Sequence, residues 1–267
     1  MRCAVWGSPI AHSLSPVLHR AAYAALGLEK WRYVRREIDE TGFAPAIAGL
    51  DGSWRGLSLT MPLKEVAASV ASSVSAAASE TGAINTLVRD GGGWAAHNTD
   101  VHGMDAALQE AGCTRPRTAI VVGSGATARS AIRALEGLGA RSVTLMVRRE
   151  ARAETVAQAR RAGLAVDVVA IGAWRPTDVI INTVPPDALT GVESLPSSGR
   201  EGGPGVLLDV VYGDGETPLQ VAAGHRGWVV VDGTAMLLHQ AGEQVRLMTG
   251  RVAPLEQMRA ALVAARS

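Results

Sequence analysis

The sequence predicts an α/β protein built from two domains. Short runs of β-branched and aliphatic residues alternate with segments of helical periodicity, which is typical of largely parallel sheets covered by helices. A polar stretch at residues 113–117 separates two such series. The length of 267 residues and the hydrophobic fraction of 47% suit one large domain or two ordinary ones with a substantial core. The simplest arrangement is two α/β domains that meet at a helix over residues 101–111, with a cleft between them.

The first half is expected to hold strands at residues 2–6, 31–37, 56–59, 83–89 and 93–97, and helices at 16–26 and 41–50. The last two strands form a predicted hairpin, because Asp90-Gly91-Gly92 between them supplies the positive φ angles of a tight turn.

The second half begins with the helix at residues 101–111, which ends at Gly112. Strands are expected at residues 118–122, 142–147, 165–170, 179–182, 206–211 and 228–231, and helices at 126–138, 151–162, 235–248 and 254–265. Residues 196–204 are expected to form a loop.

A glycine-rich turn follows the strand at residues 118–122. Residues 123–128 have the form G-x-G-x-x-A and lead directly into a helix, as the dinucleotide-binding fingerprint requires. Gly123 permits the tight turn, and Gly125 lets the backbone approach a pyrophosphate, which the N–H groups of the helix start attract. An ordinary tight turn is the alternative.

Two arginines, Arg148 and Arg149, follow the next strand. An NAD site normally has an acidic residue about 20 residues after the glycines, where it binds the ribose hydroxyls. Guanidinium groups instead suit a 2′-phosphate. The sequence therefore favours NADP over NAD, although these arginines and Arg152 could also form a solvated helix start.

Composition and charge exclude several other classes of protein. The net charge of +1 gives no electrostatic reason to bind nucleic acid or an anionic membrane surface. Neither a signal peptide nor an apolar run of about 18–20 residues is present, so a cytoplasmic location is expected. Cys3 and Cys113 are expected to be reduced thiols. The six histidines show no metal-ligand spacing and are expected to be structural or exposed, and no metal site is predicted.

Polar side chains gather at the predicted strand ends of the first half. They include Ser13 and Ser15 before a helix, Ser58, Thr60 and Lys64 after a strand, and Asn85 and Asp100 at further strand ends. Ser15 before Pro16 could be an ordinary N-cap, and Asn98 to Asp100 a helix cap. Hydroxyl, amide, ammonium and carboxylate groups in one domain favour a pocket for a small polyhydroxylated acid.

The ordered motifs of the chain resemble those of the shikimate dehydrogenase family. They are SPIAHSLSPxLH, LTMPLK, GAINTL, HNTDxxG, GSGATAR, TPL and GxxMLLHQA, in this order over nearly the whole chain. The resemblance implies reversible NADPH-dependent reduction of 3-dehydroshikimate to shikimate, in chorismate and aromatic amino-acid biosynthesis. It also implies a substrate-binding catalytic domain of residues 1–100 and 235–267, and a Rossmann-type NADP-binding domain of residues 101–234.

The resemblance assigns roles to individual residues. Lys64 and Asp100 are the implied catalytic pair, and the implied substrate ligands are Ser13, Ser15, Ser58, Thr60, Asn85, Tyr212 and Gln240. The implied cofactor ligands are Gly123, Ser124, Gly125, Ala126, Thr127, Arg148, Arg149, Thr183 and Gly233. Met236, Gln240 and Gln244 share one helix face by their spacing. The implied partners are the small-molecule substrate and NADP, in a monomer or homodimer.

Several positions depart from the family pattern. Ser58 stands where many members have asparagine, Val147 replaces a polar residue, and the turn at residues 183–186 and the segment after Tyr212 also differ. A related enzyme that uses quinate or an aminoshikimate is therefore an alternative. A dinucleotide-binding sensor without catalysis is a third hypothesis, but it would be expected to lack a catalytic group.

Lysine is the residue that the proposed chemistry needs. A lysine ammonium can stabilise a developing alkoxide and donate a proton to it, whereas arginine does not release its proton at working pH. The chain has 26 Lys and Arg residues, and only Lys30 and Lys64 are lysines. Asp100 would orient the Lys64 ammonium and favour its charged form.

Overall fold

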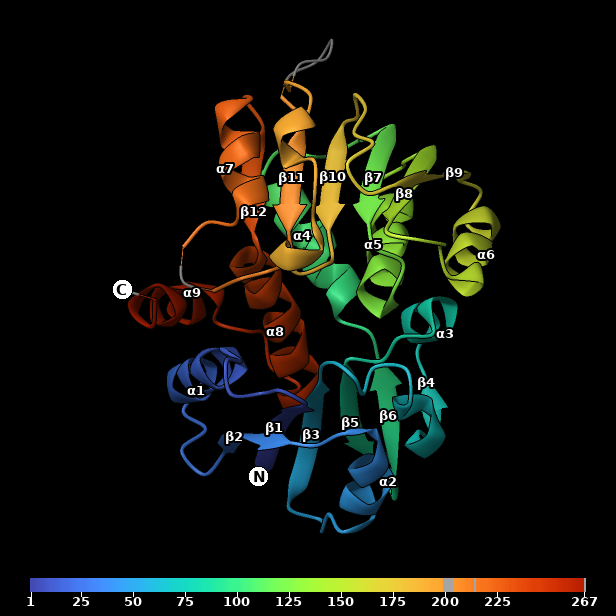
Figure 1. Cartoon of the computed structure of the whole chain (residues 1–267). Coiled ribbons are helices and arrows are strands. Elements are labelled where there is room, and N and C mark those ends of the chain that lie inside the picture. Colours follow the sequence, from blue (N-terminus) through green and yellow to red (C-terminus); the bar gives the residue numbers. More distant parts are fainter. Residues whose placement is uncertain (199–203, 214, 267) are drawn as a thin grey trace. The chain divides into compact units, whose positions relative to one another are not determined.

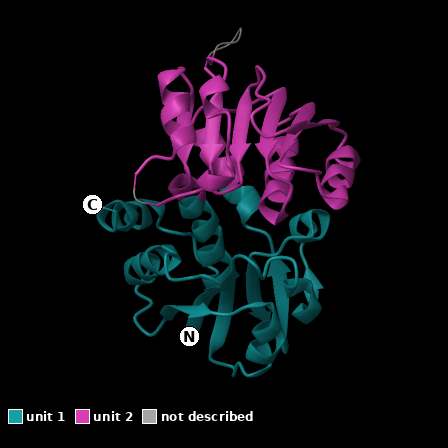
Figure 2. Cartoon of the chain, viewed as in Figure 1, with its two compact units in different colours: residues 1–103, 237–267 teal, residues 104–236 magenta. Residues whose placement is uncertain are grey.

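The computed structural model describes residues 1–198, 204–213 and 215–266 (Figure 1). The chain folds into two compact units, one of residues 1–103 and 237–267 and one of residues 104–236 (Figure 2). The units divide within helices α4 (Asp100–Glu110) and α8 (Gly233–Thr249), not at the helix starts. Among the described residues each unit contains one six-stranded sheet, so the predicted α/β class is confirmed.

The sheet of the first unit is mixed. Its order is β2-β1-β3-β5-β6-β4. The bounds are β1 (Arg2–Gly7), β2 (Arg32–Glu37), β3 (Trp54–Leu59), β4 (Ser73–Val74), β5 (Thr86–Asp90) and β6 (Gly93–His97). Strand β5 runs antiparallel to both β3 and β6. The other described pairings in this sheet, β1 with β2, β1 with β3 and β4 with β6, are parallel. The predicted hairpin is confirmed, and it introduces the antiparallel pairings.

Helices cover both faces of this sheet. They are α1 (Ser15–Ala25), α2 (Glu40–Ala48), α3 (Ala76–Thr81), α9 (Leu255–Ala264) and the 3-10 turn Ala67–Val70, and α3 and this turn were not predicted. The Asp39 side chain caps α2 at the Gly42 N–H, 2.8 Å away. Phe43 of α2 packs with Trp6 and Leu57 of the sheet in one buried cluster. On the other face, Gly56 leaves room for Met248 of α8, which a Cβ would overlap.

The sheet of the second unit is entirely parallel. Its order is β12-β11-β10-β7-β8-β9. The bounds are β7 (Thr118–Val122), β8 (Ser142–Val147), β9 (Ala165–Ala170), β10 (Val179–Asn182), β11 (Val206–Asp209) and β12 (Val229–Asp232). The apolar runs of β10 and β11 are fully buried, as expected of central parallel strands. This is the Rossmann order, in which the order of strand addition reverses between β7 and β10.

The helices of this unit connect its strands. They are α5 (Ala126–Gly137), α6 (Ala153–Arg161), α7 (Pro218–His225) and the 3-10 turns Pro186–Ala188 and Val192–Ser194. Helix α7 was not predicted, although Thr217 and Gln220 form a capping box at its start and Pro218 is in its first turn. Of the predicted loop 196–204, residues 199–203 lie outside the described residues.

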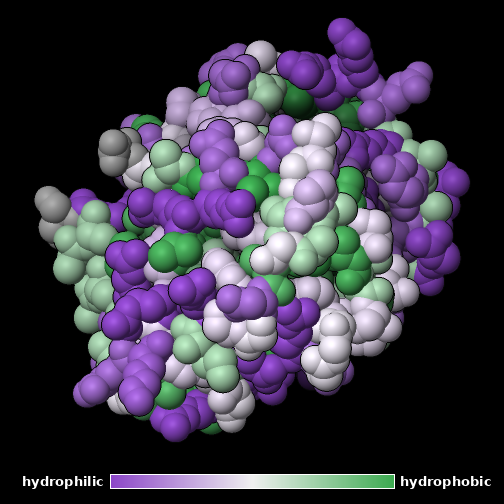
Figure 3. All heavy atoms as spheres, turned by 90° about the horizontal axis from the view of Figure 1, so that it is seen from below, coloured by the Kyte–Doolittle hydropathy of each residue, from purple (hydrophilic) through white to green (hydrophobic). Residues whose placement is uncertain are grey.

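The described surface is of mixed polarity. Hydrophilic and hydrophobic side chains are interspersed on the face drawn in Figure 3. None of the described helices combines the length and apolar character that crossing a bilayer requires. Cys3 and Cys113 are buried free cysteines.

Candidate functional site

One edge of the first sheet collects most of the predicted catalytic and substrate-binding residues. Strands β1 and β3 end at this edge, and antiparallel β5 begins there, because Ser58 pairs with Thr86. Thr86 in turn pairs with His97, the last residue of β6. The mixed direction of the strands therefore brings the residues after β3, before β5 and after β6 together.

Lys64 and Asp100 form an ion pair at this edge. The Lys64 Nζ lies 2.6 Å from Asp100 Oδ2, and the exposed fractions of the two side chains are 15% and 6%. Lys64 belongs to the turn after β3, and its carbonyl oxygen accepts the Ile84 N–H at 2.8 Å. Asp100 is the first residue of α4, where its negative charge faces the positive end of the helix dipole.

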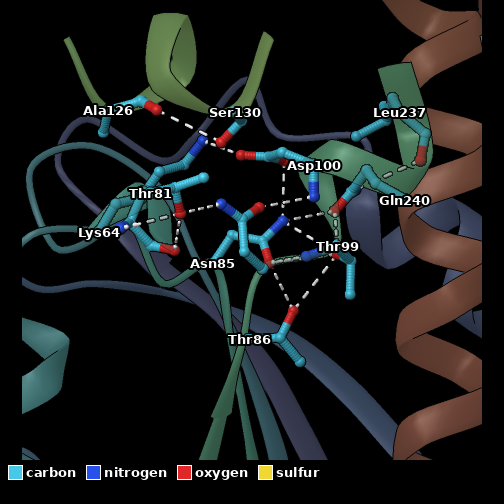
Figure 4. A network of polar contacts seen from close by, with 12 residues as sticks. Lys64, Thr81, Asn85, Thr86, Thr99, Asp100, Ala126, Ser130, Leu237 and Gln240 are labelled. Atoms are coloured by element: carbon cyan, nitrogen blue, oxygen red, sulfur yellow. Dashed lines mark hydrogen bonds and ion pairs between the residues drawn. The ribbon is translucent and has the colours of Figure 1, made fainter. Parts of the chain in front are cut away.

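Asn85 links this pair to the sheet (Figure 4). Its Nδ2 donates to Asp100 Oδ1 at 2.8 Å and to Thr99 Oγ1 at 2.9 Å. Its Oδ1 accepts the Thr99 backbone N–H at 2.8 Å and the Thr86 hydroxyl at 2.8 Å. A backbone N–H can only donate, so the orientation of the Asn85 amide is fixed. Gln240 Oε1 lies 3.3 Å from the same Nδ2.

Ser13 and Ser15 lie buried at the start of α1. The helix begins at Ser15, so Ser15 is not its N-cap, and that alternative is wrong. The Ser13 Oγ accepts the Ser15 backbone N–H at 3.3 Å, which shapes the turn into the helix. Arg35 holds this turn to β2, since its Nε donates to the Ser13 carbonyl oxygen at 2.8 Å.

Ser58 has its hydroxyl proton committed to another side chain. It donates to Gln244 Oε1 at 2.7 Å and accepts the Tyr33 hydroxyl at 2.6 Å. Thr60 is half-buried, and its N–H donates to the Trp6 carbonyl oxygen at 2.9 Å, which ties the turn after β3 to β1.

Gln244 is a member of this network to which the sequence analysis assigned no role. It lies one helical turn after Gln240 on α8, and both glutamines reach the 85–86 segment. Its Oε1 lies 3.2 Å from the Nε2 of His19, which is fully buried. Burial lowers the pKa of His19 to about 4, so this histidine is neutral at pH 7. The i, i+4 spacing was the available signal.

The glycine turn of the second unit has the geometry expected for a phosphate. Gly123 has φ +105°, and an added Cβ would lie 2.5 Å from Thr183 Oγ1. Gly125 is the N-cap of α5, and a Cβ there would meet no described atom within 4 Å. The start of α5 thus leaves space beside Gly125.

Ser124 connects this turn to the arginine segment. Its Oγ accepts the Arg152 backbone N–H at 3.2 Å, and its carbonyl oxygen accepts the Thr155 hydroxyl at 2.7 Å. Arg148 and Arg149 are exposed directly after β8. The structure therefore brings the glycine turn and the start of α6 together within this unit.

The remaining predicted residues of this unit lie after β10, β11 and β12. The Thr183 hydroxyl donates to the Val122 carbonyl oxygen at 2.6 Å. Tyr212 is half-buried in the segment after β11. Gly233 begins α8, and a Cβ there would overlap the Val210 carbonyl oxygen. Among the described residues, no group of three or more His, Cys, Asp or Glu side chains could hold a metal ion.

Two stretches of the chain match known family descriptions. Residues 5–87 match the description "Shikimate dehydrogenase substrate binding domain". Residues 233–263 match "Shikimate 5'-dehydrogenase C-terminal domain".

Relatives and solved structures align over nearly the full length. The shikimate dehydrogenase (NADP(+)) of Aeropyrum pernix is 35% identical over 100% of this chain and 98% of its own. The crystal structure of Mycobacterium tuberculosis shikimate dehydrogenase has a TM-score of 0.87 and 38% identity, covering 98% of this chain and 99% of that one. The Thermus thermophilus enzyme in complex with NADP(H) and shikimate has a TM-score of 0.84 and 30% identity, covering 99% of each chain.

Proposed function

This chain belongs to the shikimate dehydrogenase family, and on that premise we propose that it catalyses the reversible NADPH-dependent reduction of 3-dehydroshikimate to shikimate. This reaction is a step of chorismate and aromatic amino-acid biosynthesis. The observation that carries the proposal is the ion pair of Lys64 and Asp100, which lies among the hydroxyl and amide groups of one sheet edge. The similar Thermus thermophilus enzyme, solved with NADP(H) and shikimate, supports the same substrate pair.

Lys64 is the proposed proton donor. Reduction of a ring ketone places negative charge on its oxygen, and an ammonium beside that oxygen stabilises the charge and then donates a proton. Asp100 orients the ammonium through the 2.6 Å contact. In the oxidative direction Lys64, once deprotonated, accepts the proton of the substrate hydroxyl.

The substrate ligands are proposed from the residues around this pair. Asn85, which contacts Asp100, and Gln240, which contacts Asn85, bind ring hydroxyls, together with the Thr60 hydroxyl. Ser13 and Ser15 hold the substrate carboxylate with their hydroxyls. Tyr212 of the second unit is the proposed third carboxylate ligand.

The second unit has the features that an NADP site needs. The left-handed Gly123 and the open N-cap at Gly125 fit a pyrophosphate. Arginines at the first two positions after β8 fit a 2′-phosphate. Ser124, Ala126 and Thr127 complete the phosphate turn, Arg148 and Arg149 bind the 2′-phosphate, and Thr183 and Gly233 lie on the nicotinamide side. NADPH supplies the hydride when bound.

A related substrate is the second candidate, and one contact favours it. Because Ser58 gives its only proton to Gln244, it has no donor left for a substrate hydroxyl. The ring substituents that face Ser58 are therefore less constrained, which leaves quinate or an aminoshikimate as alternatives. A sensor that binds the cofactor without turnover is the third candidate.

A steady-state assay distinguishes these functions. The purified protein is incubated with shikimate or quinate and with NADP or NAD, and reduced cofactor is followed by absorbance. We expect the highest kcat/KM for shikimate with NADP. A preference for quinate would establish the second function, and cofactor binding without turnover of any substrate would establish the sensor. A monomeric or homodimeric state and a cytoplasmic location stay predictions.

A further inference from the structure

A chain of buried hydrogen bonds runs from α1 to the Lys64–Asp100 pair within the first unit. It passes from His19 to Gln244, from Gln244 to Thr86, and from Thr86 to Asn85. Asn85 then donates to Asp100. His19 and Thr86 are fully buried, and Gln244 and Asn85 are 1% and 2% exposed, so water does not replace these contacts.

The direction of each hydrogen bond in this series follows from the groups at its two ends, His19 and Asp100. The His19 Nδ1 lies 3.4 Å from the Tyr23 hydroxyl, which can donate to it, and the neutral ring then carries its proton on Nε2. That proton and the Ser58 hydroxyl both point at Gln244 Oε1, at 3.2 and 2.7 Å. Gln244 must therefore turn its Nε2 away from them.

The Gln244 Nε2 donates to Thr86 Oγ1 at 3.0 Å. Thr86 then has its oxygen occupied as an acceptor, and its own proton is directed to Asn85 Oδ1 at 2.8 Å. With its oxygen held by the Thr86 hydroxyl and by the Thr99 backbone N–H, each at 2.8 Å, Asn85 presents Nδ2 to Asp100. A reversed Gln244 amide would offer Thr86 an acceptor and draw its proton away from Asn85.

We propose that Gln244 and Thr86 are positioning residues, which act with the Thr99 backbone N–H to hold the Asn85 amide with its nitrogen against Asp100. They do this without touching the substrate. This inference rests on the proposed function for its kinetic effect, but the hydrogen-bond directions do not depend on the identity of the substrate. Ser58 takes part as the second donor that fixes Gln244.

Two substitutions of Thr86 separate the hydroxyl from the shape of the side chain. T86V keeps the branched shape and loses the donor, whereas T86S keeps the donor and loses a methyl group. We expect T86V to lower kcat roughly tenfold, which corresponds to the free energy of one buried hydrogen bond. The KM for NADP should not change. We expect T86S to stay close to the wild type. Equal losses in both variants, or no loss in either, would overturn the proposal.

A double-mutant cycle tests whether the two residues act through one chain. Q244L removes the donor to Thr86, and the T86V/Q244L double variant should lose no more kcat than T86V alone. Additive losses would contradict a common chain. S72A serves as the control, because Ser72 donates to the Trp94 carbonyl oxygen in the same sheet, away from the pair. Circular dichroism checks that each variant is folded.

Neutron diffraction of wild-type crystals grown in deuterated buffer gives a readout that needs neither activity nor a variant. The Thr86 deuteron should point at Asn85 Oδ1, and both Gln244 Nε2 deuterons should lie away from His19. A Thr86 deuteron that points at Gln244 would refute the proposal whatever the substrate is. Absence of shikimate turnover in the wild type would instead count only against the proposed function.

Discussion

Asn85 and Lys64 contact different oxygens of the Asp100 carboxylate. The Asn85 Nδ2 lies 2.8 Å from Oδ1, and the Lys64 Nζ lies 2.6 Å from Oδ2. Asp100 is therefore held by a neutral donor on one side while its other oxygen orients the ammonium. Residues that position Asn85 therefore also position the Asp100 carboxylate, and through it the Lys64 ammonium.

Substitution of Lys64 by arginine separates charge from proton transfer. K64R keeps a positive charge beside Asp100, but a guanidinium does not release its proton at working pH. We expect kcat for shikimate oxidation to fall roughly 10²–10⁴-fold, the usual contribution of general acid–base catalysis.

Lys30 gives a matched control for this substitution. It is the other lysine of the chain, and it lies exposed in a turn. K30R should retain the wild-type kcat. Wild-type turnover by K64R, measured in the same assay, would remove Lys64 from the mechanism.

The close approach of Gly123 to Thr183 predicts a specific effect of an added methyl group. G123A forces a left-handed φ on alanine, which costs about 1–3 kcal/mol, and also places a Cβ 2.5 Å from Thr183 Oγ1. We expect reduced thermal stability and a large loss of NADP affinity, measured by calorimetric titration.

G139A separates these two effects. Gly139 has φ +87°, but a Cβ there would meet no described atom within 4 Å. The variant should lose stability through its backbone and keep its affinity for NADP. Equal NADP affinity in G123A and G139A would show that the approach to Thr183 does not matter for the cofactor.

The sequence predicted the fold and the Lys64–Asp100 pair, but not the hydrogen-bond network that supports this pair. The glycine turn and the polar strand ends are local signals, since they combine residue type with position in an element. The contact between Thr86 and Gln244 is not local, because 158 residues separate the two along the chain. Only the packing of α8 onto the sheet brings them together. The i, i+4 spacing of Gln240 and Gln244 showed a common face, but not what that face contacts.

The antiparallel strand shows a similar limit. The turn at residues 90–92 predicted the hairpin, but pairing of β5 with β3 depends on contacts distant in sequence. Helix α7 could have been found, since Thr217, Pro218 and Gln220 are a recognisable helix start. The N-cap hypothesis for Ser15 was wrong because the helix begins at Ser15 itself and Ser13 accepts its N–H.

The arginines after β8 predict cofactor selectivity. R148A and R149A should each raise the KM for NADP roughly tenfold, as expected for a lost contact to a charged phosphate. The KM for NAD, which has no 2′-phosphate, should not change. R161A, an exposed arginine in the last turn of α6, is the control. An equal rise in KM for both cofactors would contradict binding of the 2′-phosphate.

The buried His19 predicts how stability depends on pH. Burial lowers its pKa from 6.5 to about 4, and it contacts Tyr23, Tyr33 and Gln244, none of which is charged at neutral pH. The unfolded chain therefore binds more protons than the folded one between these two values. The free energy of unfolding should fall as the pH falls through this window, by about 2 kcal/mol from this residue at pH 5.

Urea unfolding at pH 7 and pH 5 measures the change, and H19Q should lack the part that His19 contributes. H225Q, which replaces an exposed histidine, should keep the wild-type dependence. A wild-type pH dependence in H19Q would show that His19 does not contribute.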